Sequence, residues 1–378
     1  MSLRRVGLAV AAPALAIGIA LTVSSLVLLA SGDDPLAIYS SMWSFGTQMN
    51  SIISMVNRAV PYYLAGLAVA VGFKMNMFNI GVEGQYYLAG ILAAVVGAWL
   101  DLPGPLHVLC ICLVAMAVGA AWAGIAGVLK ATRGVNEVIS TIMLNNIVLL
   151  GFGAWLLSRF READTGGSLQ IATERIPASG LMPNLNGWLE AIGLDVPQGS
   201  RLTGFVLVAA LVGVVFYVVL ERTRFGFDLR ASGHNSWAAM SSGVDANGMV
   251  VKAMLLSGAF AGLVGMSYLL GDFGRFTGDF PTGLGFTGIA VALLGRNHPV
   301  GIALGALLWG FLERSAQRLD LEGVPKEIVV IMQGTIVLSV VVAYEIVRRI
   351  KEAQLQREVS SQVDDERVAD VAAAGAPS

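Results

Sequence analysis

Polar side chains interrupt the apolar runs of this sequence at two places where they could handle a polar solute. The first is FNIGVEGQ, which contains Asn79, Glu83 and Gln85. A carboxylate at membrane depth is costly, so it usually faces a cavity or binds a partner. Gly81 and Gly84 permit an irregular backbone, which is tolerated where it lines a pathway or is buried in protein. The stretch is equally consistent with an ordinary turn that leaves Glu83 in the first turn of a helix.

The second polar stretch is VNEVISTIMLNNIV. Its residues Glu137, Thr141 and Asn145 are spaced four apart, so on a helix they form one polar stripe beginning next to Asn136. Such a stripe can line a conduit for a polar solute. It can also hold neighbouring helices together, because amide and hydroxyl side chains hydrogen-bond across helices in membranes. Both interpretations remain open from the sequence.

The sequence contains no recognisable catalytic or nucleotide-binding pattern. None of its five lysines completes G-x-x-x-x-G-K-[ST], and G-x-S-x-G and H-E-x-x-H are absent. His107, His234 and His298 lack the spacing of metal ligands. We therefore predict no enzymatic activity, no cofactor and no metal. Cys110 and Cys112, two apart in one apolar run, point in different directions on a helix, so we expect no disulfide between them and a buried, unreactive pair.

The composition indicates a membrane protein. Of 378 residues, 56% are hydrophobic and 13% are charged, against roughly 25% charged in soluble domains. Several apolar runs reach about 20 residues, enough for a helix to cross a bilayer. The 45 glycines suit close helix packing. We predict an all-α, polytopic transmembrane helical bundle of about ten spans, some short or broken: 7–30, 58–73, 81–100, 106–130, 135–157, 202–221, 249–271, 284–295, 299–314 and 327–347.

The distribution of lysine and arginine predicts the orientation of these spans. Basic residues are denser in the segments that become cytoplasmic when the N-terminus is inside. Both termini and residues 229–244 are then cytoplasmic, and the long loop 158–201 faces outward. The first apolar run exceeds the core of a secretory signal, so it is interpreted as a retained span.

Residues 229–244, LRASGHNSWAAMSSGV, form a short polar segment between two apolar runs. We predict a short helix here, with Ser232 or Asn235 as its N-cap. Trp237, Met240 and Val244 would anchor one face. Ala238 and Ala239 would keep another face small, and Gly243 would end the helix.

Four motifs in the same order resemble one transporter family. They are FNIGVEGQ, RGVNEVISTIMLN, LRASGHNSWAA with SGAFAGLVG, and GFTGIAVALLGRNHPVG. Together they are similar to the permease subunits of ABC importers, in the branch with ribose, branched-chain amino-acid and nucleoside permeases. The first two motifs are most similar to the nucleoside (simple-sugar-like) permeases. The resemblance covers about residues 60 to 345.

This resemblance implies a bacterial inner-membrane subunit that works with other proteins. Expected partners are cytoplasmic ATP-binding cassette ATPase subunits, a second permease subunit (homologous or identical) and an extracytoplasmic solute-binding protein, with no nucleic acid. The permease domain would span 1–348. Residues 349–378 would form a cytoplasmic tail, which their charged and then alanine-rich composition predicts to be disordered.

The resemblance also assigns residues to roles. The coupling helix that contacts the ATPase would be 229–239, through Leu229, Arg230, Ala231, Gly233, Asn235, Ala238 and Ala239. His234, Ser236 and Trp237 depart from GEN-P-AA, the commoner sequence pattern of this segment in the permeases that the chain resembles. Together with the polar stretches, it suggests these residues for the solute pathway: Phe78, Asn79, Glu83, Gln85, Asn136, Glu137, Thr141, Asn145 and Phe286.

Three functions follow from these observations. Import of a nucleoside, driven by ATP hydrolysis in partner subunits, agrees best with the resemblance. The same machinery could import a monosaccharide. A third possibility of a different class is an ion-coupled secondary transporter, for which Glu83 and Glu137 are the only candidate coupling carboxylates.

Overall fold

The computed structural model of the chain is predominantly helical in the residues that it describes, which are 3–162, 170–321, 323–325, 327–343, 345–347 and 349. Extended pairing among them is limited to isolated bridges, such as Asn184 with Thr203. The chain divides into two units, one of residues 1–38 with 324–378 and one of residues 39–323 (unit 2). The predicted disorder of the tail falls on residues outside the described part, apart from position 349.

The smaller unit contains α1 (Leu3–Ser31), the start of α2 (Pro35–Gly46) and a helix over Glu327–Val347. Gly32 has φ +87°, a left-handed conformation that ends α1. Pro35 then begins α2, at a position where its missing N–H is tolerated.

Unit 2 is built around α3 (Met49–Lys74) and α12 (Ala246–Gly262). Among the candidate membrane spans of the described residues, α3 and the span Ala246–Phe273, which begins with α12, are the most buried, at 61% and 67%. Both packing faces are rich in alanine and glycine, which allows helices to approach from several sides. α3 contacts α9 (Phe205–Tyr217), α12, α14 (Leu284–Leu294) and α15 (Pro299–Leu321). The remaining helices are α4 (Val82–Trp99), α5 (Gly104–Arg133), α6 (Glu137–Ile147), α7 (Gly153–Arg159), α8 (Asn186–Ala191), α10 (Arg224–His234), α11 (Ser236–Ser241) and α13 (Met266–Tyr268).

In the described part of the chain, three membrane helices contain a π-helical turn. These turns are η1 (Val148–Phe152) between α6 and α7, η3 (Val218–Arg222) after α9, and η4 (Leu269–Phe273) after α13. A one-turn 3₁₀ helix, η2 (Ala178–Gly180), lies in the long loop. Because π turns inside helices occur often at functional sites, η3 and η4 are candidate positions for functional residues.

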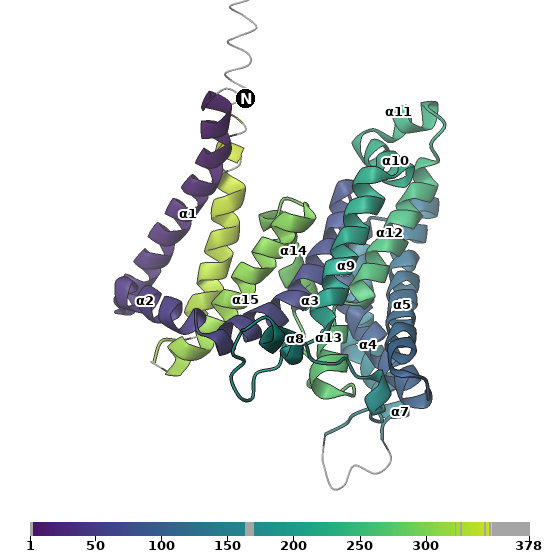
Figure 1. The fold of residues 1–378 in the computed structure, drawn as a ribbon. Coiled ribbons are helices and arrows are strands. Elements are labelled where there is room, and N and C mark those ends of the chain that lie inside the picture. The colour runs from purple at the N-terminus through teal and green to yellow at the C-terminus, as the bar shows by residue number, and fades with distance from the viewer. Residues whose placement is uncertain are drawn as a thin grey trace, which may run out of the picture. The chain divides into compact units, whose positions relative to one another are not determined.

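Figure 1 shows α10 and α11 at one end of unit 2 and α7 and α13 at the other. The order of the elements along the chain agrees with this arrangement, because α10 follows η3 at the end of α9. α8 is hydrogen-bonded to the residues that precede α9, for example from Asn186 Nδ2 to Ser200 O at 2.7 Å. The two ends of unit 2 therefore present different elements to the two sides of a membrane.

Within the described residues, six helices are long and apolar enough to cross a membrane, or seven if the bent pair α1 and α2 counts as one span, so the expected ten spans are not confirmed. α14 illustrates the reason, because its 11 residues extend about 16 Å. This is roughly half of the hydrocarbon thickness. The second predicted span, 58–73, was expected to be one of the short ones, and this prediction was wrong. α3 has 26 residues and begins at Met49, nine positions before 58.

The contact between α5 and α12 depends on glycines that face each other. A Cβ atom added to Gly119 would lie 2.8 Å from Gly262 N and 3.0 Å from Gly262 Cα, both of which are backbone atoms. The two helices are therefore held at a separation that leaves no room for a side chain at this position.

We predict that Gly119→Leu destabilises the protein by about 1–3 kcal/mol or more, because the added side chain forces α5 and α12 apart. The measurement is thermal unfolding in detergent, and the midpoint should fall by several degrees. Gly151→Leu is the matched control, since a Cβ atom there meets nothing within 4 Å. Equal midpoints for the two variants would contradict this packing.

Candidate functional site

Asn79 connects three helices through a group of buried polar side chains. Its amide pairs with that of Gln85 in both directions, at 3.0 Å from Asn79 Nδ2 to Gln85 Oε1 and 2.9 Å from Gln85 Nε2 to Asn79 Oδ1. Asn79 Nδ2 also donates to Ser257 Oγ at 2.8 Å, and Ser257 Oγ donates to Ala68 O at 2.6 Å. Asn79, Gln85 and Ser257 are each at most 1% exposed. The loop before α4 is thereby fixed to α4, α12 and α3.

Glu83 acts as the N-terminal cap of α14, although the two are far apart in sequence. Its carboxylate accepts the backbone N–H groups of Gly283 at 2.5 Å and Gly285 at 2.8 Å. The Tyr86 hydroxyl lies 2.8 Å from Glu83 Oε1 and 2.9 Å from Pro281 O. A negative charge is favourable at a helix N-terminus, where the first N–H groups lack partners within the helix. Glu83 therefore stabilises the start of a half-length helix inside the protein.

The stripe on α6 joins this arrangement through Asn145. Its Nδ2 donates to Ile80 O at 2.8 Å, and its Oδ1 accepts the Gly84 N–H at 2.8 Å. Thr141 Oγ1 donates to Glu137 O of its own helix at 2.7 Å. Asn145 thus makes contacts of the bridging kind, between α6 and the start of α4.

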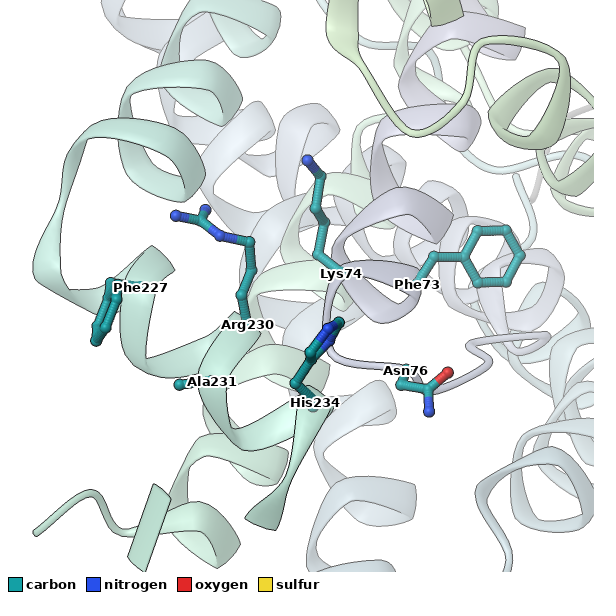
Figure 2. A pocket seen from close by; sticks show the side chains of 8 residues that line it. Phe73, Lys74, Asn76, Phe227, Arg230, Ala231 and His234 are labelled. Carbon is teal, nitrogen blue, oxygen red and sulfur yellow. The ribbon is translucent and has the colours of Figure 1, made fainter. Parts of the chain in front are cut away.

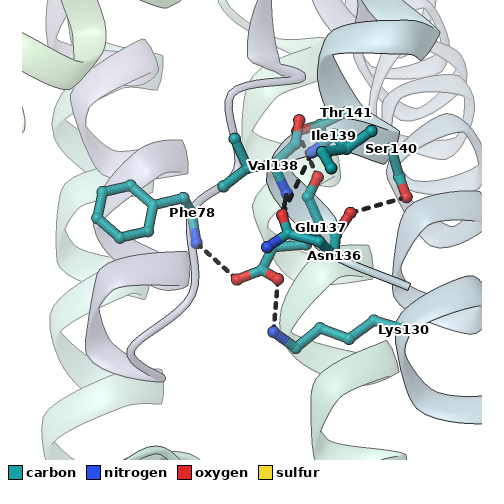
Figure 3. A network of polar contacts seen from close by, with 8 residues as sticks. All are labelled: Phe78, Lys130, Asn136, Glu137, Val138, Ile139, Ser140 and Thr141. Carbon is teal, nitrogen blue, oxygen red and sulfur yellow. Dashed lines mark hydrogen bonds and ion pairs between the residues drawn. The ribbon is translucent and has the colours of Figure 1, made fainter. Parts of the chain in front are cut away.

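Glu137 belongs to a separate polar network, drawn in Figure 3. Lys130 Nζ lies 2.5 Å from Glu137 Oε2, and the Phe78 N–H donates to Glu137 Oε1 at 3.5 Å. Asn136 caps α6, because its Oδ1 accepts the N–H groups of Val138 at 2.9 Å and Ile139 at 3.3 Å. This network joins the end of α5, the start of α6 and the loop after α3.

The rings of the two aromatic residues predicted for the pathway take no part in these polar networks, although the Phe78 N–H does. The Phe78 side chain is 48% exposed, and its ring meets that of Phe73 edge to face at 5.0 Å. Phe286, on α14, is 52% exposed. The structure thus brings most of the polar pathway residues together around the start of α4, where they bond to one another and to backbone.

Residues 229–244 form two helices, α10 and α11, instead of the single helix that was expected. Asn235 separates them, and its Oδ1 accepts the Ala238 N–H at 3.1 Å as the N-cap of α11. Ser232, the other expected cap, lies inside α10. Gly243 has φ +83° and ends α11 as predicted.

The predicted anchoring of this segment by Trp237 was wrong. Trp237 is 78% exposed, whereas Leu229 and Ala239 are buried. Gly233 lies against the backbone of Met75, where a Cβ atom would be 2.7 Å from Met75 Cα. Small residues therefore hold α10 against the end of α3, while the large aromatic side chain faces outward.

Charged side chains add a second connection between α10 and α3. Glu221, in η3, lies 2.5 Å from Lys74 Nζ and 3.4 Å from Arg230 Nη1. Arg230 Nη1 also donates to Leu220 O. Sequence reasoning missed Lys74 and Glu221, because their 147-residue separation leaves no local pattern.

A cavity of about 740 Å³ lies beside this connection. In Figure 2, Lys74 and Arg230 extend on one side of it and Phe73 and Phe227 lie apart from each other. Its lining consists of Phe73, Lys74, Asn76, Phe227, Arg230, Ala231, Gly233 and His234. Among the coupling residues predicted from the sequence, Arg230, Ala231 and Gly233 line it, whereas Asn235 and Ala238 lie outside it on the exposed side.

Comparison with known proteins identifies relatives along most of the chain. The family model described as branched-chain amino acid transport system / permease component matches residues 51–341. The guanosine ABC transporter permease protein NupP of Bacillus subtilis is 37% identical, over 88% of this chain and 93% of the relative. The glucose ABC transporter permease protein TsgB13 of Haloferax volcanii is 34% identical, over 88% and 87%. The nucleoside ABC transporter permease protein NupB of Lactococcus lactis is 30% identical, over 88% and 90%. No solved structure matches.

The role of Glu83 generates a prediction. Glu83→Ala removes the acceptor of two N–H groups and should destabilise the protein by about 2 kcal/mol or more, since a buried donor left without a partner is costly. Glu83→Gln keeps one carbonyl oxygen as an acceptor, so the stability of this variant should lie between that of the wild type and that of Glu83→Ala. The measurement is hydrogen exchange of the backbone amides at residues 283–287. Exchange there should be faster in Glu83→Ala than in the wild type.

The control for this measurement is Glu190→Ala, because Glu190 is exposed on α8. Exchange at 283–287 that is as slow in Glu83→Ala as in Glu190→Ala would rule out the cap.

Proposed function

This chain belongs to the family of branched-chain amino acid transport system permease components, and we propose that it forms the solute pathway of an ATP-driven importer of nucleosides. It is a multi-pass membrane protein and a transport subunit, not an enzyme. The observation that carries the substrate class is the similarity to NupP and NupB, which are named as guanosine and nucleoside permeases. The similarity to TsgB13, named as a glucose permease, makes a monosaccharide the second candidate.

The partners in this proposal are ATP-binding cassette subunits, a second permease subunit and an extracytoplasmic solute-binding protein. ATPases would dock on α10 and α11, in the segment 229–239. Phe227 and Trp237 support this, because they are 64% and 78% exposed and large exposed aromatic side chains commonly dominate protein interfaces. The tie of α10 to α3 through Glu221 supports a role in transmitting motion.

The proposed location is the inner membrane of a bacterial cell, with both termini and α10–α11 cytoplasmic and the 158–201 loop outside. Lysine and arginine near the α10 end support this orientation, among them Lys74, Arg222, Arg224 and Arg230. Aromatic stacking by Phe78 or Phe286, both half exposed, could assist a nucleobase along the pathway.

Ion coupling through Glu83 or Glu137, the two carboxylates suggested by the sequence, is less compatible with their contacts. Glu83 already accepts two backbone N–H groups, and Glu137 already pairs with Lys130. A coupling carboxylate must be able to exchange its partner for a sodium ion or a proton during transport. The carboxylates of Glu83 and Glu137 are engaged in contacts that hold helices together. This agrees better with ATP than with an ion gradient as the energy source.

The test is uptake of tritiated guanosine by proteoliposomes that contain the full-length chain with its ATPase subunits and binding protein. Uptake should require ATP and persist when ionophores collapse proton and sodium gradients. Trp237→Ala should lower ATPase co-purification and uptake about tenfold or more, as expected for the loss of an interface hot spot.

Trp188→Ala is the matched control. Trp188 is 79% exposed but lies on α8, near the residues that precede α9. It should keep both co-purification and ATP-driven uptake. Uptake that stops with the ionophores, or a Trp237→Ala variant that behaves like Trp188→Ala, would contradict the proposal.

A further inference from the structure

A second group of polar side chains surrounds a cavity of about 240 Å³ in unit 2. The cavity lies at the end of α9 opposite to α10, because Thr203, just before α9, forms part of its wall. The other lining residues come from α3 and from the α13–η4 helix. The full lining is Ser54, Asn57, Arg58, Thr203, Ser267, Tyr268 and Asp272.

The wall next to α9 is held rigidly by Asn57. Its Nδ2 donates to Arg201 O at 2.6 Å, and its Oδ1 accepts the Thr203 N–H at 3.1 Å. Thr203 Oγ1 in turn accepts the Phe205 N–H at 3.1 Å. These hydrogen bonds fix the positions of Asn57 and Thr203, so this part of the cavity lining is preorganised for an occupant.

The lining from α13 includes a buried polar group without a partner among the described residues. Ser267 is only 3% exposed, and within the described part of the chain its Oγ has no hydrogen-bond partner. Buried hydroxyls are normally satisfied, so an unsatisfied one that lines a cavity indicates a missing occupant. Water or the hydroxyl of a ligand would satisfy it.

The charged residues of the cavity lie within membrane helices, where ionisable groups usually mark a functional site. Arg58 Nη1 donates to Glu313 Oε1 at 2.9 Å, which orients a guanidinium that has further N–H donors. Asp272 is more exposed than Ser267 and lines the same cavity as Arg58. It belongs to the π turn η4, and π turns occur often at functional sites.

We propose, on the basis of the function proposed above, that this cavity binds a vicinal diol of the transported solute. The carboxylate of Asp272 can accept two hydroxyl donors, and Arg58 and Ser267 can donate to hydroxyl oxygens. Arg58 is already paired with Glu313, so the carboxylate of Asp272 disfavours an anionic group. The volume is below the roughly 300–1,000 Å³ of sites for larger ligands, which suits one sugar ring. The diol can come from the ribose of a nucleoside or from a free monosaccharide.

The test uses the full-length chain with its ATPase subunits in nanodiscs, without the binding protein, so that only this cavity and the pathway bind solute. Bound tritiated guanosine is displaced by unlabelled guanosine, 2′,3′-dideoxyguanosine or glucose. Guanosine should compete about tenfold or more better than the dideoxy analogue, because hydrogen bonds from hydroxyls to a charged acceptor are lost. Asp272→Asn should remove most of this difference, and Ser267→Ala should weaken guanosine binding severalfold.

Asp320→Asn is the matched control, since it makes the same charge change at an exposed position at the end of α15. It should bind like the wild type. Displacement by glucose would support the diol site with a free monosaccharide as a second source. If only tritiated glucose binds, with the same dependence on Asp272, the nucleoside assignment fails and the diol site stands. Equal competition by guanosine and its dideoxy analogue, or a difference that persists in both variants, would mean that the cavity holds only water and would overturn the inference.

Discussion

The carboxylate of Glu83 is the interaction on which the inner arrangement of unit 2 depends. It accepts two N–H groups at the start of α14, a helix too short to cross a bilayer alone. No water in a hydrocarbon layer can satisfy such groups, so the chain must supply the acceptor itself. In the irregular backbone before α4, Asn79 accepts the Gly81 N–H and Asn145 donates to Ile80 O. The glycines of this stretch are compatible with a membrane only because side chains from distant helices complete its hydrogen bonds.

α3 connects the two ends of unit 2. Lys74 at its C-terminus meets Glu221, which also lies close to Arg230 of α10, while Asn57 and Arg58 near its other end form part of the polar cavity. Sixteen residues separate Arg58 from Lys74, which is about 24 Å along a helix. Packed helices with charged contacts at both ends are suitable carriers of motion between distant sites. In the proposed importer, a displacement of α10 by an ATPase would reach the cavity through α3, which contains Pro61 between the two sites.

Features set by local chemistry could be predicted from the sequence. Asn235 caps α11, Gly243 ends it, and the predicted span 81–100 differs from α4 by one residue at each end. Tertiary contacts set the rest. The start of α3 was missed because its first turns contain polar residues such as Asn57, which is accommodated only by its bonds to the segment before α9. The partners of Glu83, and the pairing of Lys74 with Glu221, join segments about 150 to 200 residues apart, for which hydrophobic periodicity contains no signal.

The most direct test of the account is whether the contact between Lys74 and Glu221 links ATP hydrolysis to transport. The measurement is guanosine transported per ATP hydrolysed by the reconstituted transporter, for Lys74→Gln, Glu221→Gln and the double variant. We expect each single variant to hydrolyse ATP but to transport severalfold less per ATP, and the double variant to be no worse than the singles, because the residues act as one pair. An unchanged ratio in all three variants would contradict the view that α10 acts on the pathway through α3.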